Sequence, residues 1–411
     1  MAPKLPTTPT LQGRRTASQA GTPASTSPQG NGVGRSSAQR RFPFGPGGSG
    51  GSPPRAERAL LLLAALLSPA CTPIQTDHLL AWTRSDDGTY MIAPRDVPEL
   101  DDATHMRGAL GTVTHGGRIR NNPDGSGDYT GGVDLVVHAD VQTIGGEQVA
   151  VPLDEDGLLL YTFYANLAAA RTAVEAHGID TTAIFPMAAA WNPAVSPLLE
   201  FAPADNAAYA TGANVFMLLP DGDDRDVPVL ANEGVIFHEF GHAILHLLMT
   251  HDPGAPPLVI DPAVESYYWQ ASLHEGFADT LATLLLDDPR FIDASLDLPL
   301  RHVDDDHAVV DDSMLPSTRM STDLSQIADD PYPLGTVYAS FAWDLREATD
   351  PDTALVIVLD AIARWAPQGA SDMDGTVYLS CLLQAADDAG LGDAACASNE
   401  ARFALLGVPC P

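Results

Sequence analysis

The sequence predicts an α+β protein: a sheet-bearing N-terminal lobe, a mostly helical C-terminal lobe, and one apolar helix between them. From Asp77 to Asp156, short alternating runs are separated by Gly, Asp and Pro turns, which is typical of β-strands. Beyond residue 158, longer apolar stretches begin and end at capping residues, which is typical of helices. The segment 232–249 is apolar on nearly every face, as expected of a helix that runs through a core.

The first 58 residues are rich in Pro, Gly, Ser, Thr, Ala and Arg, with almost nothing apolar to bury, so we expect a disordered leader. Residues 59–71 follow basic residues, contain a short apolar run and end at Ser68-Pro69-Ala70-Cys71. This run is too short to span a bilayer but matches the apolar core and exit of a signal peptide. We therefore expect export to the extracellular space or the cell envelope.

Cys71 lies where a bacterial lipoprotein carries its lipid, and the residues before it loosely resemble a lipobox. The usual Leu three residues before the cysteine is Ser68 here, so a signal peptide that is cleaved without lipidation is the alternative. A lipid at Cys71 is the only membrane contact that we expect. One disulfide among Cys381, Cys396 and Cys410 would suit an oxidising compartment and leave one thiol, unless Cys71 pairs with it.

We divide the rest of the chain into a β-rich region, residues 72–157, and a second domain, residues 158–411. The β-rich region is either an N-terminal sheet of the functional unit or the remnant of a propeptide. Its clearest strand patterns are at 133–141 and 147–151. In the second domain we expect strands at 183–187 and 213–218, and further helices at 158–177, 334–348, 351–365, 376–388 and 399–406.

The chain is strongly acidic, with a formal net charge of −33. Residues 1–58 carry eight basic residues and one acidic residue, so the remainder is at about −40. Such a surface repels nucleic acid and anionic lipid. Carboxylate clusters at Asp221-Gly222-Asp223-Asp224, 304–306 and 311–312 are candidate Ca²⁺ sites, but none has EF-hand spacing and solvated acidic loops are the favoured alternative.

The apolar helix contains His238-Glu239-Phe240-Gly241-His242. Two histidines four residues apart leave the same helix face one turn apart, so His238 and His242 can both bind one Zn²⁺. Glu239 beside them can accept a proton from a metal-activated water. The alternative is a buried helix that carries two histidines by chance. His246 continues the stripe, but it lies about 12 Å from His238 along the helix, too far to share a metal, so we expect it to be a core or supporting residue.

Glu275 is the predicted third metal ligand, which leaves a fourth position for water. Asp279 lies one helical turn further on, where its carboxylate can accept the spare ring N–H of a ligand histidine. The alternative role of Glu275 is a capping box with Ser272, because S-x-x-E also marks helix starts. His274 is the next candidate ligand.

The His238-Glu239-x-x-His242 and Glu275-x-x-x-Asp279 motifs resemble those of gluzincin zinc metallopeptidases, the thermolysin-like and fungalysin-like families. This resemblance covers roughly residues 158–408 and implies a thermolysin-like catalytic domain. The segment 205–218 is similar to the edge strand that holds peptide substrates in those families. The resemblance implies that Asn206, through its side chain, and Ala207, through its carbonyl, bind the substrate backbone. An Asn-capped turn before a strand is the alternative.

The segment 331–339 resembles the family segment that opens a helix and supplies a histidine to the oxyanion. Tyr332 stands in place of that histidine. A phenol can also donate to an oxyanion, and alternative donors are Tyr267, Tyr268, His302 and His307. We therefore expect an exported, monomeric zinc endopeptidase that acts on peptides or proteins. The alternatives are a catalytically inactive surface protein with a structural zinc or a peptide-binding cleft, and a metal-free, acid-rich adhesion module.

Overall fold

The computed structural model describes residues 73–121, 126–195, 206–220, 226–251, 265–315, 331–369 and 374–411, and all structural statements concern these residues. Contacts divide the chain into two units, Met1–Ser68 and Pro69–Pro411, and every described residue belongs to the second. The predicted leader, signal peptide and lipid at Cys71 therefore lie outside the described residues. Within the described ranges, no helix has the length and apolarity needed to cross a membrane.

The fold is mixed α+β, as predicted, with the described strands in two sheets. In the first sheet β1 lies between antiparallel β2 and parallel β8, and β7 follows β8 at the far edge. Its bounds are β2 (Tyr90–Asp96), β1 (His78–Arg84), β8 (Glu147–Pro152) and β7 (Ala139–Ile144).

The second sheet has the order β11-β12-β9-β5-β4-β3, and β6 and β10 also pair with β5. The strand β11 stands at one end of this order and pairs antiparallel with β12, so among the described residues its other side is a free edge. The bounds are β3 (Leu100–Asp102), β4 (Arg107–Gly108), β5 (Gly111–Asn121), β6 (Gly127–Asp134), β9 (Met187–Trp191), β10 (Ala194–Val195), β11 (Asn206–Ala210) and β12 (Val215–Leu219).

Three strand predictions were wrong in their bounds. The run predicted at 133–141 is the end of β6, a break, and the start of β7. The strand predicted at 183–187 begins only at Met187, and the one predicted at 213–218 begins at Val215, after a 3-10 turn at Thr211–Ala213. Where these strands begin is fixed by pairing with β5 and β9, and alternation along one strand does not show where its partner starts.

The helices agree better with the sequence because their caps are local. Asp154 accepts a hydrogen bond from the amide of Gly157 at the start of α2, and Asp350 accepts one from Thr353 at the start of α7. The helix predicted at 399–406 was wrong: it begins earlier, ends at Arg402, and is followed by a 3-10 turn. The bounds are α2 (Glu155–Ala176), α3 (Glu233–Thr250), α4 (Glu265–Leu286), α6 (Pro331–Ala348), α7 (Pro351–Gly369), α8 (Gly375–Asp388) and α9 (Gly392–Arg402).

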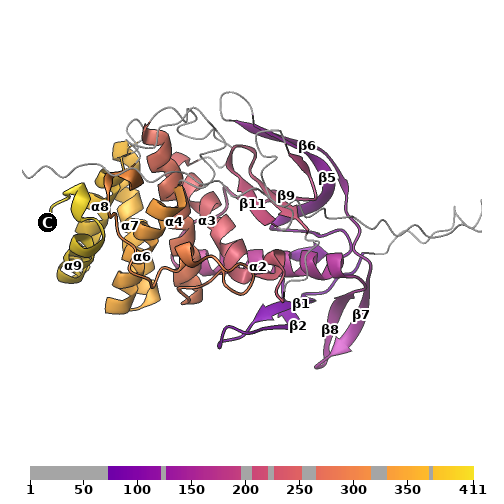
Figure 1. Cartoon of the computed structure of the whole chain (residues 1–411). Coiled ribbons are helices and arrows are strands. Elements are labelled where there is room, and N and C mark those ends of the chain that lie inside the picture. Colours follow the sequence, from indigo (N-terminus) through magenta and orange to yellow (C-terminus); the bar gives the residue numbers. More distant parts are fainter. Residues whose placement is uncertain are drawn as a thin grey trace, which may run out of the picture. The chain divides into compact units, whose positions relative to one another are not determined.

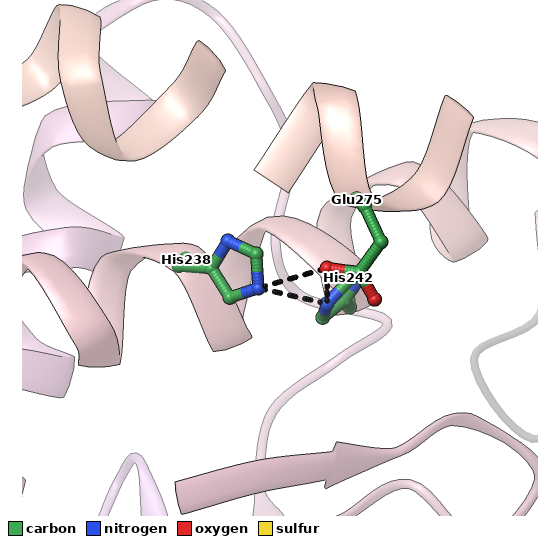
Figure 2. Close-up of side chains that lie close together, drawn as sticks. All are labelled: His238, His242 and Glu275. Carbon is green, nitrogen blue, oxygen red and sulfur yellow. Dashed lines mark hydrogen bonds and ion pairs between the residues drawn. The ribbon is translucent and has the colours of Figure 1, made fainter. Parts of the chain in front are cut away.

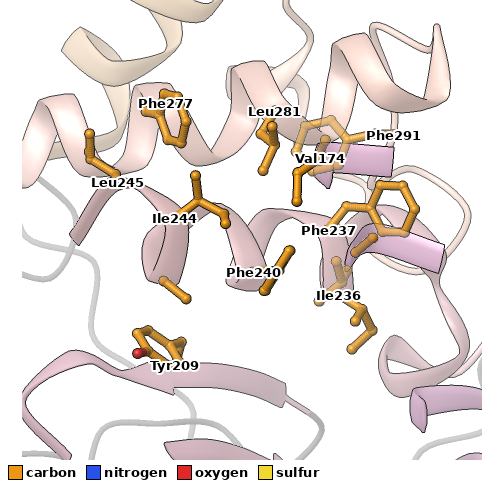
Figure 3. Close-up of a cluster of buried hydrophobic side chains, with 14 of the residues drawn as sticks. Val174, Tyr209, Ile236, Phe237, Phe240, Ile244, Leu245, Phe277, Leu281 and Phe291 are labelled. Carbon is orange, nitrogen blue, oxygen red and sulfur yellow. The ribbon is translucent and has the colours of Figure 1, made fainter. Parts of the chain in front are cut away.

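The core is centred on α3, which packs against α2, α4 and β11. In Figure 1, the strands lie on one side of α3 and the helices α6 to α9 lie beyond α4 on the other. Figure 3 shows the apolar side chains of α3, including Phe240 and Ile244, between α4 and the strand that carries Tyr209. Because nearly every face of α3 is buried, the helix is held from several sides.

The C-terminal tail is joined to α9 by a disulfide between Cys396 and Cys410. Cys381 is buried on α8 as a free thiol. The sequence left this pairing open, since three cysteines so close in the chain can pair in any combination.

Candidate metal centre

The two histidines of α3 converge because the helix is regular through both. Asn232 caps α3 by accepting a hydrogen bond from the amide of Gly234 at 2.9 Å. One helical turn separates His238 from His242, and their Nε2 atoms lie 3.2 Å apart. Both nitrogens therefore face the same point, as the sequence predicts for a shared ion.

Glu275 reaches this point from α4, a different helix. A Cβ atom on Gly241 would lie 2.7 Å from the Cα of Ala278, so glycine allows α3 and α4 to cross closely here. The Oε2 atom of Glu275 lies 3.4 Å from Nε2 of His238 and 3.8 Å from Nε2 of His242. Figure 2 shows the three side chains turned toward one another.

The three side chains fit a metal ion. Each offers one ligand atom, and these atoms lie within 4.8 Å of one another. The Oε2 atom of Glu275 is buried without a hydrogen-bond partner, which is costly for a carboxylate oxygen unless a cation neutralises it. Two imidazoles and one carboxylate are a common ligand set for Zn²⁺. Among the described residues, no other group of three His, Cys, Asp or Glu side chains could hold a metal in this way.

Ser272 lies inside α4, which begins at Glu265. The alternative role of Glu275, in a capping box with Ser272, was therefore wrong. The reason is that α4 extends upstream of the local S-x-x-E pattern, so that pattern does not mark the helix start.

Asp279 binds the far side of His238. Its Oδ1 atom lies 2.8 Å from Nδ1 of His238 and can accept the proton of that nitrogen, which turns Nε2 toward the point shared with His242 and Glu275. Arg301 donates to both oxygens of the same carboxylate, so the buried charge of Asp279 is paired. The sequence motif placed Asp279 here, whereas Arg301 comes from a 3-10 turn with no motif around it.

The pKa values of the three side chains in the cluster are shifted in different directions. Burial lowers the pKa of His242 to about 4. Burial and Arg301 also act against protonation of His238, but the nearby carboxylates of Asp279 and Glu275 outweigh them and raise its pKa to about 9. Burial opposes the charged form of Glu275, yet His242 and His238 hold its pKa at about 2. Without metal, His238 is therefore a charged imidazolium at neutral pH, and the neighbouring carboxylates balance its charge.

Glu239 lies beside His238, and its carboxylate faces the cluster. Its Oε1 atom is 3.9 Å from Nε2 of His238, and its Oε2 atom accepts a hydrogen bond from the backbone amide of Tyr209 on β11 at 2.8 Å. Burial raises the pKa of Glu239 to about 7, which is suited to a group that takes up and returns protons near neutral pH.

A cavity of about 240 Å³ opens onto these groups. It is lined by His238, Glu239, His242, Glu275 and the other residues that the sequence singled out, Asn206, Ala207 and Tyr332, and also by Val235, Ile292, Leu296 and Arg301. The cluster is therefore reachable from outside, unlike a closed structural metal site.

Tyr332 is at the start of α6, and the guanidinium carbon of Arg301 lies 4.9 Å from the centre of its ring. A Cβ on Gly276 would lie 2.6 Å from the carbonyl oxygen of Gly335, so a pair of glycines brings α6 close to α4 at this level. Glu275 and burial raise the pKa of Tyr332, so its phenol stays protonated and can donate a hydrogen bond. Tyr332 lines the cavity, as the resemblance led us to expect.

The alternative donors have other neighbours. His302 contacts Asp293 at 2.8 Å, and Nε2 of His307 contacts the carbonyl of His302 at 2.8 Å. Tyr267 and Tyr268 pack edge to face against each other. Within the described chain, the cavity lining contains none of these four residues.

His246 and His274 lie next to the cluster but outside it. The ring of His274 stacks on that of His242, with centroids 5.9 Å apart, and burial lowers the pKa of His274 to about 3. His246 is buried in the core, as its distance along the helix predicts.

The two acidic clusters among the described residues do not line the cavity. Asp304 pairs with Arg290 at 3.1 Å, and Asp311 accepts a hydrogen bond from the amide of Ser313. The cluster at 221–224 lies outside the described residues. Calcium binding therefore stays a prediction from the sequence.

The structure thus defines a mixed α+β protein with an accessible two-histidine, one-glutamate cluster that could hold a metal ion. Compared with known protein families and with curated proteins, the chain matches none of them.

Proposed function

We propose that this protein is a zinc-dependent peptidase of the gluzincin type, with a thermolysin-like arrangement of a sheet-bearing lobe and a helical lobe around α3. One observation carries the proposal: His238 and His242 from α3 and Glu275 from α4 converge at the cavity that Glu239 also lines. A structural zinc site is usually closed by four protein ligands, whereas this cluster offers three and has a further carboxylate beside it in an open cavity.

In this proposal His238, His242 and Glu275 hold Zn²⁺, and Asp279 orients His238. A bound ion would supply acidity to a water molecule and polarise the carbonyl that is attacked. The ligand set is suited to this because three protein ligands would leave a fourth ligand position for water.

Glu239 is the general base. The amide of Tyr209 fixes one oxygen of its carboxylate, and the other lies on the side of His238. Glu239 takes a proton from the attacking water and then gives it to the nitrogen of the leaving amine, because its raised pKa favours both transfers near neutral pH.

Tyr332 donates a hydrogen bond to the carbonyl oxygen as negative charge develops on it. The contact with Arg301 fixes the ring, and the raised pKa keeps the hydroxyl proton in place. This assigns to a phenol the task that the resembled families give to a histidine.

The substrate is proposed to lie along the free edge of β11. The amide of Tyr209 points from this strand toward Glu239, and alternate residues of a strand point their backbone groups to the same edge. The backbone of Ala207 therefore faces the cavity as well and can pair with an extended peptide. Asn206 lines the same cavity, which supports the proposal that its side chain binds the peptide backbone.

The test is Glu239→Gln, which keeps the size of the side chain and removes its basicity. We expect zinc content unchanged and casein hydrolysis slower by roughly a hundred- to ten-thousand-fold. Glu347→Gln, on an exposed glutamate paired with Arg346, is the matched control and should keep full activity. Hydrolysis retained in Glu239→Gln would reject the base assignment.

A second candidate is a catalytically inactive protein in which zinc is structural or the cleft binds a peptide without cutting it. Tyr332 in place of the family histidine is the observation that favours it. A chelator separates the two: loss of hydrolysis supports the peptidase, whereas a lowered melting temperature in a protein that never hydrolyses casein supports the inactive form. Export and the monomeric state are predictions from sequence alone.

A further inference from the structure

Three distant segments of the chain meet at the side chain of Asn232, the N-cap of α3. Its Oδ1 atom accepts hydrogen bonds from the amide of Gly234 at 2.9 Å and from the hydroxyl of Tyr90, on β2, at 3.0 Å. Its Nδ2 group donates to the carbonyl of Ile292 at 3.2 Å. The side chain is fully buried, so its orientation is set by these partners and not by solvent.

Tyr90 is what fixes the amide in this orientation. Its hydroxyl donates to Asn232 and also accepts a hydrogen bond from the amide of Glu233 at 3.1 Å. One phenol thus uses both its donor and its acceptor capacity on the first turn of α3. A second side chain of β2, Arg95, contacts Glu233 at 3.3 Å, so the N-terminal sheet holds the start of α3 at two points.

The partner on the other side of Asn232 is part of the cavity wall. Ile292 lines the cavity together with Val235, which lies in the first turn of α3. A Cβ on Gly234 would lie 2.4 Å from the carbonyl oxygen of Phe291, so the helix start and the segment 291–292 are in direct contact. Asn232 therefore bonds both to the helix turn that carries Val235 and to the backbone of Ile292.

The catalytic groups are held by other contacts. His238 is fixed by Asp279, Glu239 by the amide of Tyr209, and Glu275 comes from α4. The Tyr90–Asn232 contact does not touch any of these side chains. The contacts that hold the proposed catalytic groups are therefore separate from those that hold Val235 and Ile292 in the cavity wall.

We propose that Tyr90, acting through Asn232, is a positioning residue that sets the width of the substrate cavity between Val235 and Ile292. This rests on the proposed function, and it gives the N-terminal sheet a role in substrate binding. It predicts an effect on KM and not on kcat, because the wall contacts the substrate whereas the catalytic groups stay in place.

The test is Tyr90→Phe, which removes only the hydroxyl. The probe is a quenched-fluorescent peptide built on the main casein cleavage site of the wild-type protein. Loss of one positioning hydrogen bond should raise KM about three- to tenfold, with kcat and zinc affinity within about twofold of wild type. The matched control is Tyr129→Phe, which removes a hydroxyl bonded to Thr114 and Gly116 in the β5–β6 pair and should leave KM unchanged.

A second variant tests the hydrogen bond from Asn232 to Ile292. Asn232→Asp keeps an oxygen to cap α3 and to accept from Tyr90, but it cannot donate to Ile292, and it should also raise KM. A lower melting temperature with unchanged KM in both variants would show that the contact only stabilises the fold, and it would overturn the inference. Failure of the wild-type protein to hydrolyse casein would instead reject the proposed function, and the inference with it.

Discussion

Asp279 accepts the Nδ1 proton of His238 at 2.8 Å, and the two side chains come from different helices. This contact directs Nε2 toward His242 and Glu275, where a metal can bind once that nitrogen has lost its proton. Arg301 pairs with the same carboxylate, and its Nη2 atom also lies 3.0 Å from Nδ1 of His238. The orientation of the His238 ring is therefore set before a cation binds.

Asp279→Asn should weaken zinc binding. Contacts of this kind typically contribute ten- to hundredfold to metal affinity, so the zinc dissociation constant should rise by about that factor in competition with a chelator. Asp304→Asn is the matched control, because it removes a carboxylate paired with an exposed arginine. Equal zinc affinity in both variants would show that Asp279 does not orient His238.

Tyr332→Phe should slow hydrolysis and keep zinc. Loss of one donor to a developing oxyanion typically lowers kcat about a hundred- to thousandfold. KM should change little, because the hydrogen bond strengthens only in the transition state. The measurement is steady-state kinetics together with zinc content. Tyr267→Phe is the control and should keep the wild-type kcat. An unchanged kcat in Tyr332→Phe would show that another group donates to the oxyanion.

Zinc affinity should depend on pH well above neutrality. The pKa of His238 is raised to about 9, so in the metal-free protein both ring nitrogens carry a proton at pH 7 to 8. Zinc needs the neutral ring and competes with that proton, so the apparent affinity should rise as pH increases toward 9 and then level off. Chelator competition across this range measures it. An affinity that levels off near pH 7 would mean that the pKa of His238 is not raised.

Removing the disulfide should destabilise the C-terminal region without altering the site. A cross-link closing a loop of this size typically contributes about 2–3 kcal/mol, so a denaturant titration of the double variant Cys396→Ser, Cys410→Ser should give a free energy of unfolding lower by that amount. A reducing agent should have the same effect on the wild-type protein and none on the variant. Equal stability of oxidised and reduced wild-type protein would contradict the prediction.

The parts of the site that the sequence predicted are those encoded locally. His238 and His242 are one turn apart on a helix whose cap and apolar pattern are both visible in the sequence. Asp279 likewise follows Glu275 by one turn on the same helix, so the position of one residue also gives that of the other. Local spacing fixes relative position within a helix, and such predictions need no knowledge of the tertiary fold.

The parts that it did not predict depend on contacts between distant segments. Arg301 is separated from Asp279 by an irregular stretch with no repeating pattern, so nothing in the sequence indicates that the two meet. The Tyr90–Asn232 contact joins residues 142 positions apart. The starts of β9 and β12 were missed for the same reason, because strand pairing is set by partners elsewhere in the chain.

The most direct test of the account is anomalous diffraction at the zinc absorption edge from crystals of the zinc-loaded protein. The account predicts one strong peak about 2 Å from Nε2 of His238, Nε2 of His242 and a carboxylate oxygen of Glu275, with the side toward Glu239 and Tyr332 open to the cavity. A peak at another position, or a fourth protein ligand closing that side, would contradict it.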